Sequence, residues 1–269
     1  MPRTLDPAAR LSLVVPLYNE EHRVSRTAFV LTQFIEKLGN GSELVFVDDG
    51  SSDGTVDIVQ RLIKDLDGRP RLICRPHEGK GAAVTAGIES ANCDYIGFCD
   101  VDLATPLADV AHLLQVSRQN GGLTIGSRAL QDSNVLVHEH ASREFLGRAY
   151  NLVLRSTLTP GIYDTQCGAK VAPREIWAAI IQHCREPGFA WDVEVIATAM
   201  ALGFGVQEVP VTWAHDPGTR VRVLRDGVRM LTSLVGITRR ARALGRSLRP
   251  GVAKDDGLVI LAEKSPIVE

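Results

Sequence analysis

Short apolar runs alternate with amphipathic segments along the first part of the chain. Five short runs predict strands, and the first of them is apolar enough for a strand that is covered on both faces. They are Leu11–Leu17, Leu44–Val47, Arg71–Cys74, Tyr95–Cys99 and Leu123–Gly126. Between them, four segments repeat apolar residues every three or four positions, as amphipathic helices do. They are Val24–Leu38, Val56–Leu66, Gly79–Ala91 and Pro106–Gln119. Strands that alternate with helices predict an α/β fold with a mostly parallel central sheet flanked by helices.

Beyond residue 126 the pattern changes. The sequence predicts helices at Phe145–Leu154, Arg174–His183 and Trp191–Leu202, the last of them amphipathic, a strand at Val206–Trp213 and an irregular polar loop at Gln131–His140. From Val223 onward, an apolar stripe with arginines on the other face predicts a C-terminal amphipathic helix. The stripe consists of Leu224, Val228, Leu231, Leu234, Val235 and Thr238. We therefore divide the chain into an N-terminal extension (1–10), one α/β domain (11–215), this basic helix (216–250) and a loose tail (251–269).

The composition is that of a folded globular protein. Of 269 residues, 45% are hydrophobic and 23% are charged, which excludes a disordered chain. Five cysteines without a CxxC pair argue against a disulfide framework or a structural zinc site and favour a reducing compartment. The chain begins without an apolar leader and has no apolar run of the ~18 residues that span a bilayer. We therefore expect a cytoplasmic protein that does not cross a membrane by itself.

Charge is distributed unevenly along the chain. Between residues 216 and 250, nine arginines and two aspartates give a net charge of +7, whereas the whole chain carries −2 and the remainder therefore −9. A basic helix on an acidic body indicates an anionic partner, and we expect it to lie at the inner surface of a membrane. The alternative is an ordinary helix packed on the domain, or one half of a homodimer contact. No aromatic residues alternate with the arginines, which argues against nucleic acid.

Polar clusters follow the first four predicted strands. They are Tyr18–Glu21, Asp48–Gly54, Pro76–Gly81 and Asp100–Asp102. A single cluster of this kind is what any turn or helix cap uses. Four clusters at the carboxyl ends of parallel strands indicate a ligand site, because these ends meet at one edge of the sheet.

Two of these clusters suggest phosphate chemistry. Asp100 and Asp102, one residue apart at a strand end, can share a divalent cation with the phosphates of a nucleotide. Lys80, between two glycines at a helix start, can contact a phosphate or a carboxylate of the donor site; alternatively it is a solvated lysine. The chain has neither GxxxxGK[ST] nor a GxGxxG after its first strand, which argues against ATP hydrolysis and hydride transfer.

An ordered set of motifs extends from Leu11 to Leu234. The motifs are VVPLYNEE (Val14–Glu21), VDDGSSDGT (Val47–Thr55), HEGKGAA (His77–Ala83), DVD (Asp100–Asp102), GSR (Gly126–Arg128), DTQCGAK (Asp164–Lys170), WDVEV (Trp191–Val195) and EVPVTW…GTRV (Glu208–Val221). In this order they resemble family 2 glycosyltransferases with the GT-A nucleotide-sugar-binding fold. The second half resembles the branch of dolichyl-phosphate β-glucosyltransferases and bacterial polyprenyl-phosphate relatives.

The resemblance implies a donor site at the first four motifs. Pro16, Tyr18 and Glu20 would line the base and ribose of a UDP-sugar, and Asp49, or Asp48, would accept a hydrogen bond from the uracil ring. Lys80 would contact the phosphates. Asp100 would hold the ribose or sugar, and Asp102 would bind Mg²⁺ or Mn²⁺ that bridges the diphosphate; the DVD spacing makes Asp100 a metal ligand as well.

The later motifs imply an acceptor side. Arg128, and the turn from Gln166 to Lys170, would face the transferred sugar and the acceptor. Arg220 and Arg222 could hold a phosphate, because guanidinium groups bind phosphate with two hydrogen bonds.

The WDVEV motif supplies an acidic group near the acceptor. Asp192 would be the general base for a hydroxyl acceptor, or a positioning group for a lipid phosphate, whose oxygen is already anionic near pH 7. The interpretation of Glu194 stays open between a second such acid and a cap or solvated helix position.

The resemblance thus implies an inverting, metal-dependent hexosyltransferase. It would move a hexose, glucose first, from a UDP-sugar to a polyprenyl or dolichyl phosphate. A soluble small-molecule or polysaccharide hydroxyl acceptor is one alternative. A nucleotide-sugar-binding module without turnover is the other.

Overall fold

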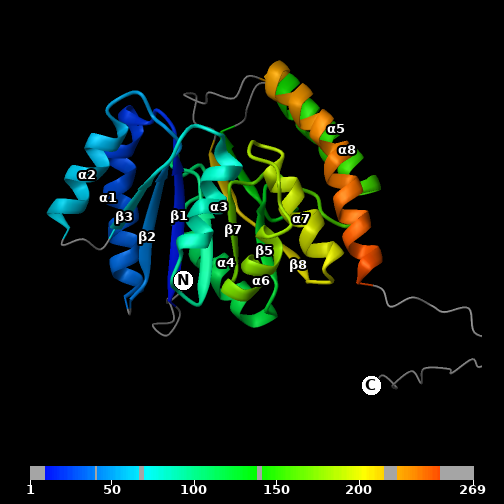
Figure 1. The fold of residues 1–269 in the computed structure, drawn as a ribbon, viewed down its shortest axis with the longest axis horizontal. Helices are drawn as coiled ribbons and strands as arrows, with labels where there is room; N and C mark the ends of the chain where they lie inside the picture. Colours follow the sequence, from blue (N-terminus) through cyan, green and yellow to red (C-terminus); the bar gives the residue numbers. More distant parts are fainter. Residues whose placement is uncertain (1–9, 40, 67–69, 138–140, 215–222, 249–269) are drawn as a thin grey trace, which may run out of the picture.

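The computed structural model describes residues 10–39, 41–66, 70–137, 141–214 and 223–248 as a central sheet between layers of helices (Figure 1). The strands of this sheet are β1 (Leu11–Leu17), β2 (Glu43–Asp48), β3 (Pro70–Cys74), β4 (Tyr95–Cys99), β5 (Leu123–Ser127), β7 (Ala169–Pro173) and β8 (Val206–Pro210). Their order is β3-β2-β1-β4-β7-β5-β8. Within the described sheet, β7 runs antiparallel to both of its neighbours and the other pairs are parallel, so the predicted α/β class and mostly parallel sheet are confirmed.

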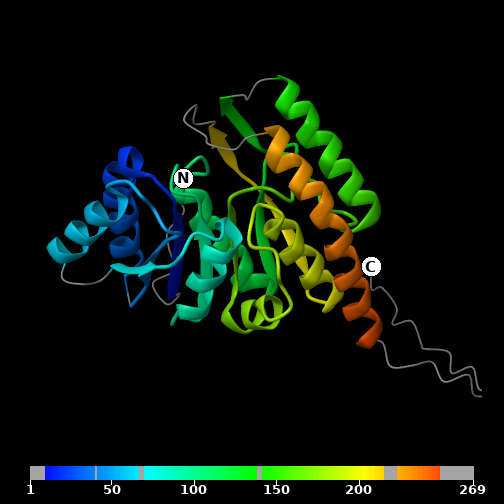
Figure 2. The same cartoon turned by 45° about the horizontal axis from the view of Figure 1, so that its top comes forward.

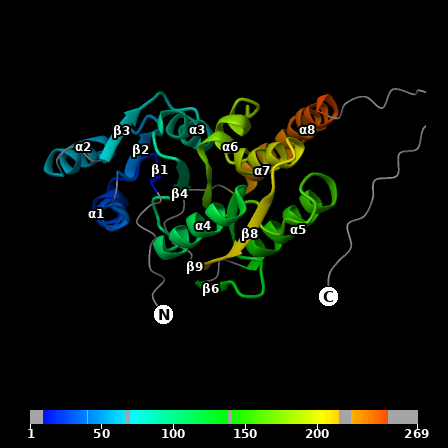
Figure 3. The same cartoon turned by 90° about the horizontal axis from the view of Figure 1, so that it is seen from below.

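Helices cover both faces of the sheet (Figure 3). They are α1 (Glu21–Leu38), α2 (Thr55–Asp65), α3 (Lys80–Ser90), α4 (Leu107–Asn120), α5 (Ala141–Thr157), α6 (Arg174–Ile181), α7 (Trp191–Ala201) and α8 (Val223–Ser247). One hydrophobic core joins the sheet to α1 and α4, with Leu13 and Val15 of β1 at its centre. The other joins it to α3, α6 and α7, with Val14 and two buried tryptophans, Trp177 and Trp191. Because alternate residues of β1 enter opposite cores, its unbroken hydrophobicity is explained.

Two expected elements differ from the structure. The predicted strand Val206–Trp213 is two strands, β8 and β9 (Thr212–Ala214), and β9 pairs in parallel with β6 (Asn134–Val137) inside the stretch expected to be a loop. Figure 2 shows this small sheet standing apart from the main one. The helix α7 is not amphipathic, since its residues from Trp191 to Ala199 are buried on every side.

The C-terminal helix α8 packs along α7. Ile237 is 1% exposed and lies in a small core with Ala190 and Ala197. This face of α8 therefore packs on the domain, as the alternative to a membrane-surface helix predicted. Leu231 and Val235 are exposed, so the predicted apolar stripe is divided between the core and the surface. The division into domains remains a prediction, and the extension 1–9 and the tail 251–269 lie outside the described residues. Within the described part of the chain, every helix is too short or too polar to cross a bilayer.

Candidate active site

The carboxyl ends of β1, β2 and β4 meet at one edge of the sheet. Leu17 at the end of β1 pairs with Asp48 at the end of β2, so the segments that follow the two strands leave the sheet together. Tyr18, Asp49 and Asp100 follow the ends of these strands directly. The parallel topology therefore gathers the predicted donor-site motifs at one edge.

Two stacked rings lie at the β1 side of this edge. The ring centroids of Tyr18 and His77 are 4.0 Å apart, with 17° between the ring planes. Both rings are largely exposed, so the pair presents a flat aromatic surface of the kind that stacks on a nucleobase. Of the other residues predicted here, Glu20 forms an ion pair with Arg23 at 2.9 Å, and Pro16 lies within β1.

The two aspartates at the end of β2 differ in what their oxygens bind. Asp49 accepts hydrogen bonds from the backbone N–H groups of Glu78 (3.1 Å) and Gly79 (2.7 Å), so it holds the loop before α3. One oxygen of Asp48 accepts from the turn 50–51, and its other oxygen, Oδ1, is buried without a hydrogen-bond partner among the described residues. Of the two aspartates, Asp48 is therefore the one with a buried acceptor atom that has no hydrogen-bond partner among the described residues.

Lys80 begins α3 and contacts two carboxylates. Its Nζ lies 2.7 Å from Oδ1 of Asp100 and 3.9 Å from Oδ2 of Asp192. Burial alone would lower the pKa of Lys80, but the charges of Asp100 and Asp192 and the hydrogen bond to Asp100 raise the pKa above its ordinary value. Lys80 is therefore a charged ammonium at the point where β4, α3 and α7 meet.

A second lysine lies beneath the first. Lys170 on β7 is fully buried, and its Nζ donates to Oδ1 of Asp192 at 2.5 Å and to the backbone oxygen of Cys167 at 2.8 Å. Asp192, in the first turn of α7, is 2% exposed. Lys170 was expected to face an acceptor, whereas in the structure its ammonium is enclosed. It supports Asp192 instead.

Asp102 lies on a strained turn after β4. The following residue, Leu103, has a φ of 51°, a region that residues with a side chain rarely adopt. The turn is held by two hydrogen bonds. The Leu103 N–H donates to the backbone oxygen of Asp100, and the Ala104 N–H donates to Oδ1 of Asp102. Burial first, and then the charge of Asp100, raise the pKa of Asp102 above its ordinary value.

These two aspartates fit a divalent cation. Carboxylate oxygens are hard ligands of the type that Mg²⁺ and Mn²⁺ prefer, and a cation would offset the repulsion that raises the pKa of Asp102. The part of the chain that the structure describes contains no cluster of three or more His, Cys, Asp and Glu side chains able to hold a metal. The remaining ligands would come from a phosphate-bearing substrate and water, as is usual for Mg²⁺.

Gly168 fixes the position of Asp100. The Asp100 N–H donates to the oxygen of Gly168 at 3.1 Å, and a Cβ atom on Gly168 would lie 2.0 Å from Oδ2 of Asp100. Any larger residue would displace this carboxylate. The glycine of the DTQCGAK motif is therefore explained by its close approach to the DVD motif.

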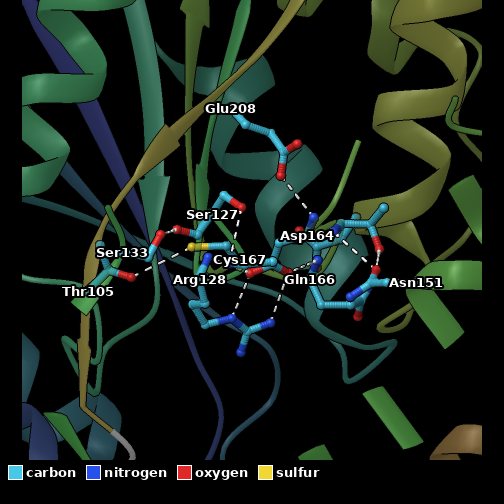
Figure 4. A network of polar contacts seen from close by, with 12 residues as sticks. Thr105, Ser127, Arg128, Ser133, Asn151, Asp164, Gln166, Cys167 and Glu208 are labelled. Carbon is cyan, nitrogen blue, oxygen red and sulfur yellow. Dashed lines mark hydrogen bonds and ion pairs between the residues drawn. The ribbon is translucent and has the colours of Figure 1, made fainter. Parts of the chain in front are cut away.

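Arg128 is held by a network that joins β5, β8 and α5 (Figure 4). Its guanidinium donates two hydrogen bonds to the buried carboxylate of Asp164, at 2.7 and 2.9 Å. Glu208 on β8 accepts from the Asp164 N–H, and Asn151 on α5 accepts from Thr165. Burial alone would raise the pKa of Asp164, but the charge and hydrogen bonds of Arg128 lower it below its ordinary value.

Two polar side chains near these groups have a buried atom with no hydrogen-bond partner among the described residues. They are Gln166, through Nε2, and Tyr150 on α5, through its hydroxyl. Burial, and then the charges of Asp192 and Glu186, raise the pKa of Tyr150. Gln166 was expected at the site. Tyr150 belongs to none of the sequence motifs, and only the influence of the buried Asp192 on it identifies it as a site residue.

Glu194 differs from one of its two interpretations, that of a cap or solvated helix position. It is 1% exposed, accepts hydrogen bonds from the N–H groups of Arg185 and Glu186, and forms an ion pair with Arg240 on α8. It is neither a solvated helix position nor a cap. Arg220 and Arg222, the two predicted phosphate contacts, lie outside the described residues.

Residues 12–180 match the family model described as glycosyl transferase family 2. The chain is 30% identical over 219 residues to glycosyltransferase AglD of Haloferax volcanii, covering 80% of this chain and 35% of that protein, so it spans about a third of that relative. It is 29% identical over 241 residues to the dolichyl-phosphate beta-glucosyltransferase of Dictyostelium discoideum, covering 84% of this chain and 73% of that protein. The mouse protein of the same name is 30% identical over 228 residues, with 80% and 70% covered.

The fold is also that of solved glycosyltransferases. Glucosyl-3-phosphoglycerate synthase from Mycobacterium tuberculosis, in complex with Mn²⁺, UDP and phosphoglyceric acid, superposes with a TM-score of 0.64. The match covers 87% of this chain and 79% of that chain, at 18% identity. At this identity the likeness is one of fold, and it confirms the predicted GT-A architecture.

Proposed function

Since this chain belongs to glycosyltransferase family 2, in the branch of the dolichyl-phosphate β-glucosyltransferases, we propose that it transfers glucose to a polyprenyl or dolichyl phosphate. The donor is UDP-glucose, and the transfer inverts the configuration at the anomeric carbon of the sugar. The observation that carries the proposal is the line of charges at the carboxyl edge of the sheet. There, Lys80 bridges Asp100 of the DVD motif and the buried Asp192.

This line of charges suits a diphosphate donor. Lys80 is charged, partly exposed and fixed at the start of a helix, where an ammonium and the helix N-terminus both attract phosphate. The buried and unpaired Oδ1 of Asp48 is the acceptor atom left for the N–H of a uracil ring, and the Tyr18–His77 pair offers a stacking surface. A nucleoside diphosphate sugar is therefore the donor class that these groups fit.

Asp100 and Asp102 are the residues that would hold Mg²⁺ or Mn²⁺. The relevant structural neighbours were solved with Mn²⁺ and UDP. When bound, such a cation stabilises negative charge on a diphosphate leaving group. Lys80 adds a fixed positive charge at the same place, so the chain itself assists departure of UDP.

A lipid phosphate acceptor needs no general base. One of its anionic oxygens attacks the anomeric carbon, the bond from that carbon to the β-phosphate oxygen breaks, and UDP leaves with the electron pair. Asp192 lies between two ammonium groups, 2.5 Å from that of Lys170 and 3.9 Å from that of Lys80. In this arrangement its role is to position Lys80. Gln166 and Tyr150 each have a buried polar atom that is unpaired among the described residues.

The outward face of α8 is the part of the molecule that would meet an anionic membrane carrying such an acceptor. Its exposed residues follow one another at three- and four-residue steps and are apolar first and basic afterwards. They are Leu231, Val235, Arg239, Arg242 and Arg246. Each arginine near an anionic surface contributes about 1 kcal/mol, so three of them give weak, reversible binding.

The transfer assay uses the purified chain with radiolabelled UDP-glucose, Mn²⁺ or Mg²⁺ and a polyprenyl phosphate in detergent. Radioactive label in the organic phase would support UDP-glucose as the donor and the polyprenyl phosphate as the acceptor. Loss of this label with EDTA, and in the Asp102→Asn variant, would support the divalent cation. Metal-dependent release of UDP without label in that phase refutes the lipid acceptor and favours a soluble hydroxyl acceptor. No release, with UDP-glucose bound, favours a binding module.

Membrane contact is tested separately by sedimentation with vesicles. We expect binding to vesicles that contain phosphatidylglycerol, little binding to phosphatidylcholine alone, and loss of binding at high salt. The variant with Arg239, Arg242 and Arg246 changed to Glu should stay in solution. Equal sedimentation of both proteins, or a stable dimer in place of sedimentation, would contradict a membrane role for this face.

A further inference from the structure

One arginine of α8 points into the protein. Nε and Nη2 of Arg240 donate to Oε1 of Glu194 at 2.9 and 2.6 Å, and Nη2 also donates to Glu186 at 3.0 Å. Its neighbours Arg239 and Arg242 are exposed. Arg240 and Glu194 lie beyond residues 12–180, the part of the chain that matches the family model.

The carboxylate that Arg240 binds also holds a loop. The other oxygen of Glu194, Oε2, accepts hydrogen bonds from the backbone N–H groups of Arg185 and Glu186, each at 2.7 Å. These residues belong to the connection between α6 and α7. The guanidinium on α8 is therefore joined to this connection in two ways, through the buried carboxylate of Glu194 to its backbone and directly to the carboxylate of Glu186.

The connection in turn packs against the start of α3. The oxygen of Pro187 accepts a hydrogen bond from the Ala82 N–H at 3.0 Å. A Cβ atom on Gly79 would lie 2.6 Å from the Pro187 oxygen, and one on Gly81 would lie 2.4 Å from Cβ of Trp191. Contacts this close leave no space for the two segments to shift independently. The residue between the two glycines is Lys80.

On the premise that this site binds a UDP-sugar as proposed above, we infer that Arg240 is a positioning residue for donor binding. Through Glu194 and the loop 185–188, it fixes the start of α3 and thereby the distance between Lys80 and Asp100. The helix α8 then does more than cover the domain: its packing sets the geometry of the donor site. Arg240 acts through Glu194 and touches neither substrate nor cation.

The test compares Arg240→Gln with two controls on the same helix. Arg239→Gln removes an exposed charge, and Ile237→Ala loosens the packing of α8 on α7 without touching Glu194. Hydrogen exchange of the ligand-free chain follows the amides of residues 79–84 and 185–190. We expect faster exchange of both segments in Arg240→Gln, unchanged exchange in Arg239→Gln, and faster exchange of α8 alone in Ile237→Ala.

Binding of UDP with Mn²⁺ gives the second readout. Arg240→Gln should weaken it about tenfold, in the range of couplings carried by packed networks, and Arg240→Lys should recover most of the loss. Unchanged exchange at 79–84 in Arg240→Gln overturns the inference, as does an equal effect of Ile237→Ala on both readouts. Altered exchange at 79–84 in a protein that binds no UDP upholds the positioning role and refutes the donor proposed above.

Discussion

Replacing Lys170 by Met tests the buried part of the site. The ammonium of Lys170 lies 2.5 Å from Asp192, and these side chains are 0% and 3% exposed. The substitution keeps the volume and leaves a buried carboxylate without its nearest cation. Removing one partner of a buried pair destabilises a protein by about 3–5 kcal/mol. Because the Lys80 ammonium remains 3.9 Å from Asp192, we expect the lower end, about 3 kcal/mol.

Urea unfolding followed by tryptophan fluorescence measures this loss. With a slope of about 3 kcal/mol per M, the unfolding midpoint should fall by about 1 M. Adding Asp192→Asn to Lys170→Met should return much of the loss, since the buried charge is then gone. As a control, Arg10→Ala breaks the exposed pair with Asp94 and should leave the midpoint unchanged. A Lys170→Met midpoint that equals that of the wild type would refute the buried pair.

Three further predictions concern the groups around this pair. Gly168→Ala should reduce turnover by about 100-fold while the protein stays folded. The added Cβ displaces Asp100, and a shift of about 1 Å at a catalytic group has an effect of this size. A variant with normal turnover would contradict the close approach of Gly168 to Asp100. Asp164 has a lowered pKa, so its contribution to stability is present above the unfolded pKa of about 3.9 and is lost as the pH falls through the folded pKa. Unfolding midpoints measured from pH 7 to pH 3 should therefore fall less steeply in Asp164→Asn than in the wild type, and parallel curves would contradict this. Removing divalent cations with EDTA should abolish release of UDP from the wild type, and restored Mn²⁺ should not rescue Asp102→Asn.

The gathering of polar residues at the carboxyl edge of the sheet could be predicted from the sequence because its signals are local. The strands β1, β2 and β4 are mostly apolar and buried, whereas β3 is a partly buried edge strand. The polar residues follow the strands closely, as at Asp49, Lys80 and Asp100. Once the strands are parallel, their carboxyl ends must share an edge. The bounds of β1 and β4 agree with the prediction to the residue.

The acceptor side could not be predicted in the same way, because its polar residues are paired over long distances. The strand β7 carries Lys170, a residue that argues against a buried strand until its partner Asp192 is known. The helix α7 carries Asp192 and Glu194, and acidic side chains are usually exposed, although both of these are buried. Their partners, on β7 and α8, come from other parts of the chain, and no local pattern reveals such pairs.

The two acids of α7 explain why a helix outside the sheet matters for the site. An α-helix turns about 100° per residue, so positions 192 and 194 point in nearly opposite directions. Asp192 accordingly binds the lysines of the donor edge, while Glu194 binds Arg240 on α8. Because both carboxylates are buried, neither can move without leaving a charge unpaired. The helix α7 therefore carries one buried carboxylate toward Lys80 and the other toward Arg240 on α8. On the inference drawn above, a change at Arg240 reaches Lys80 through Glu194 and the loop 185–188.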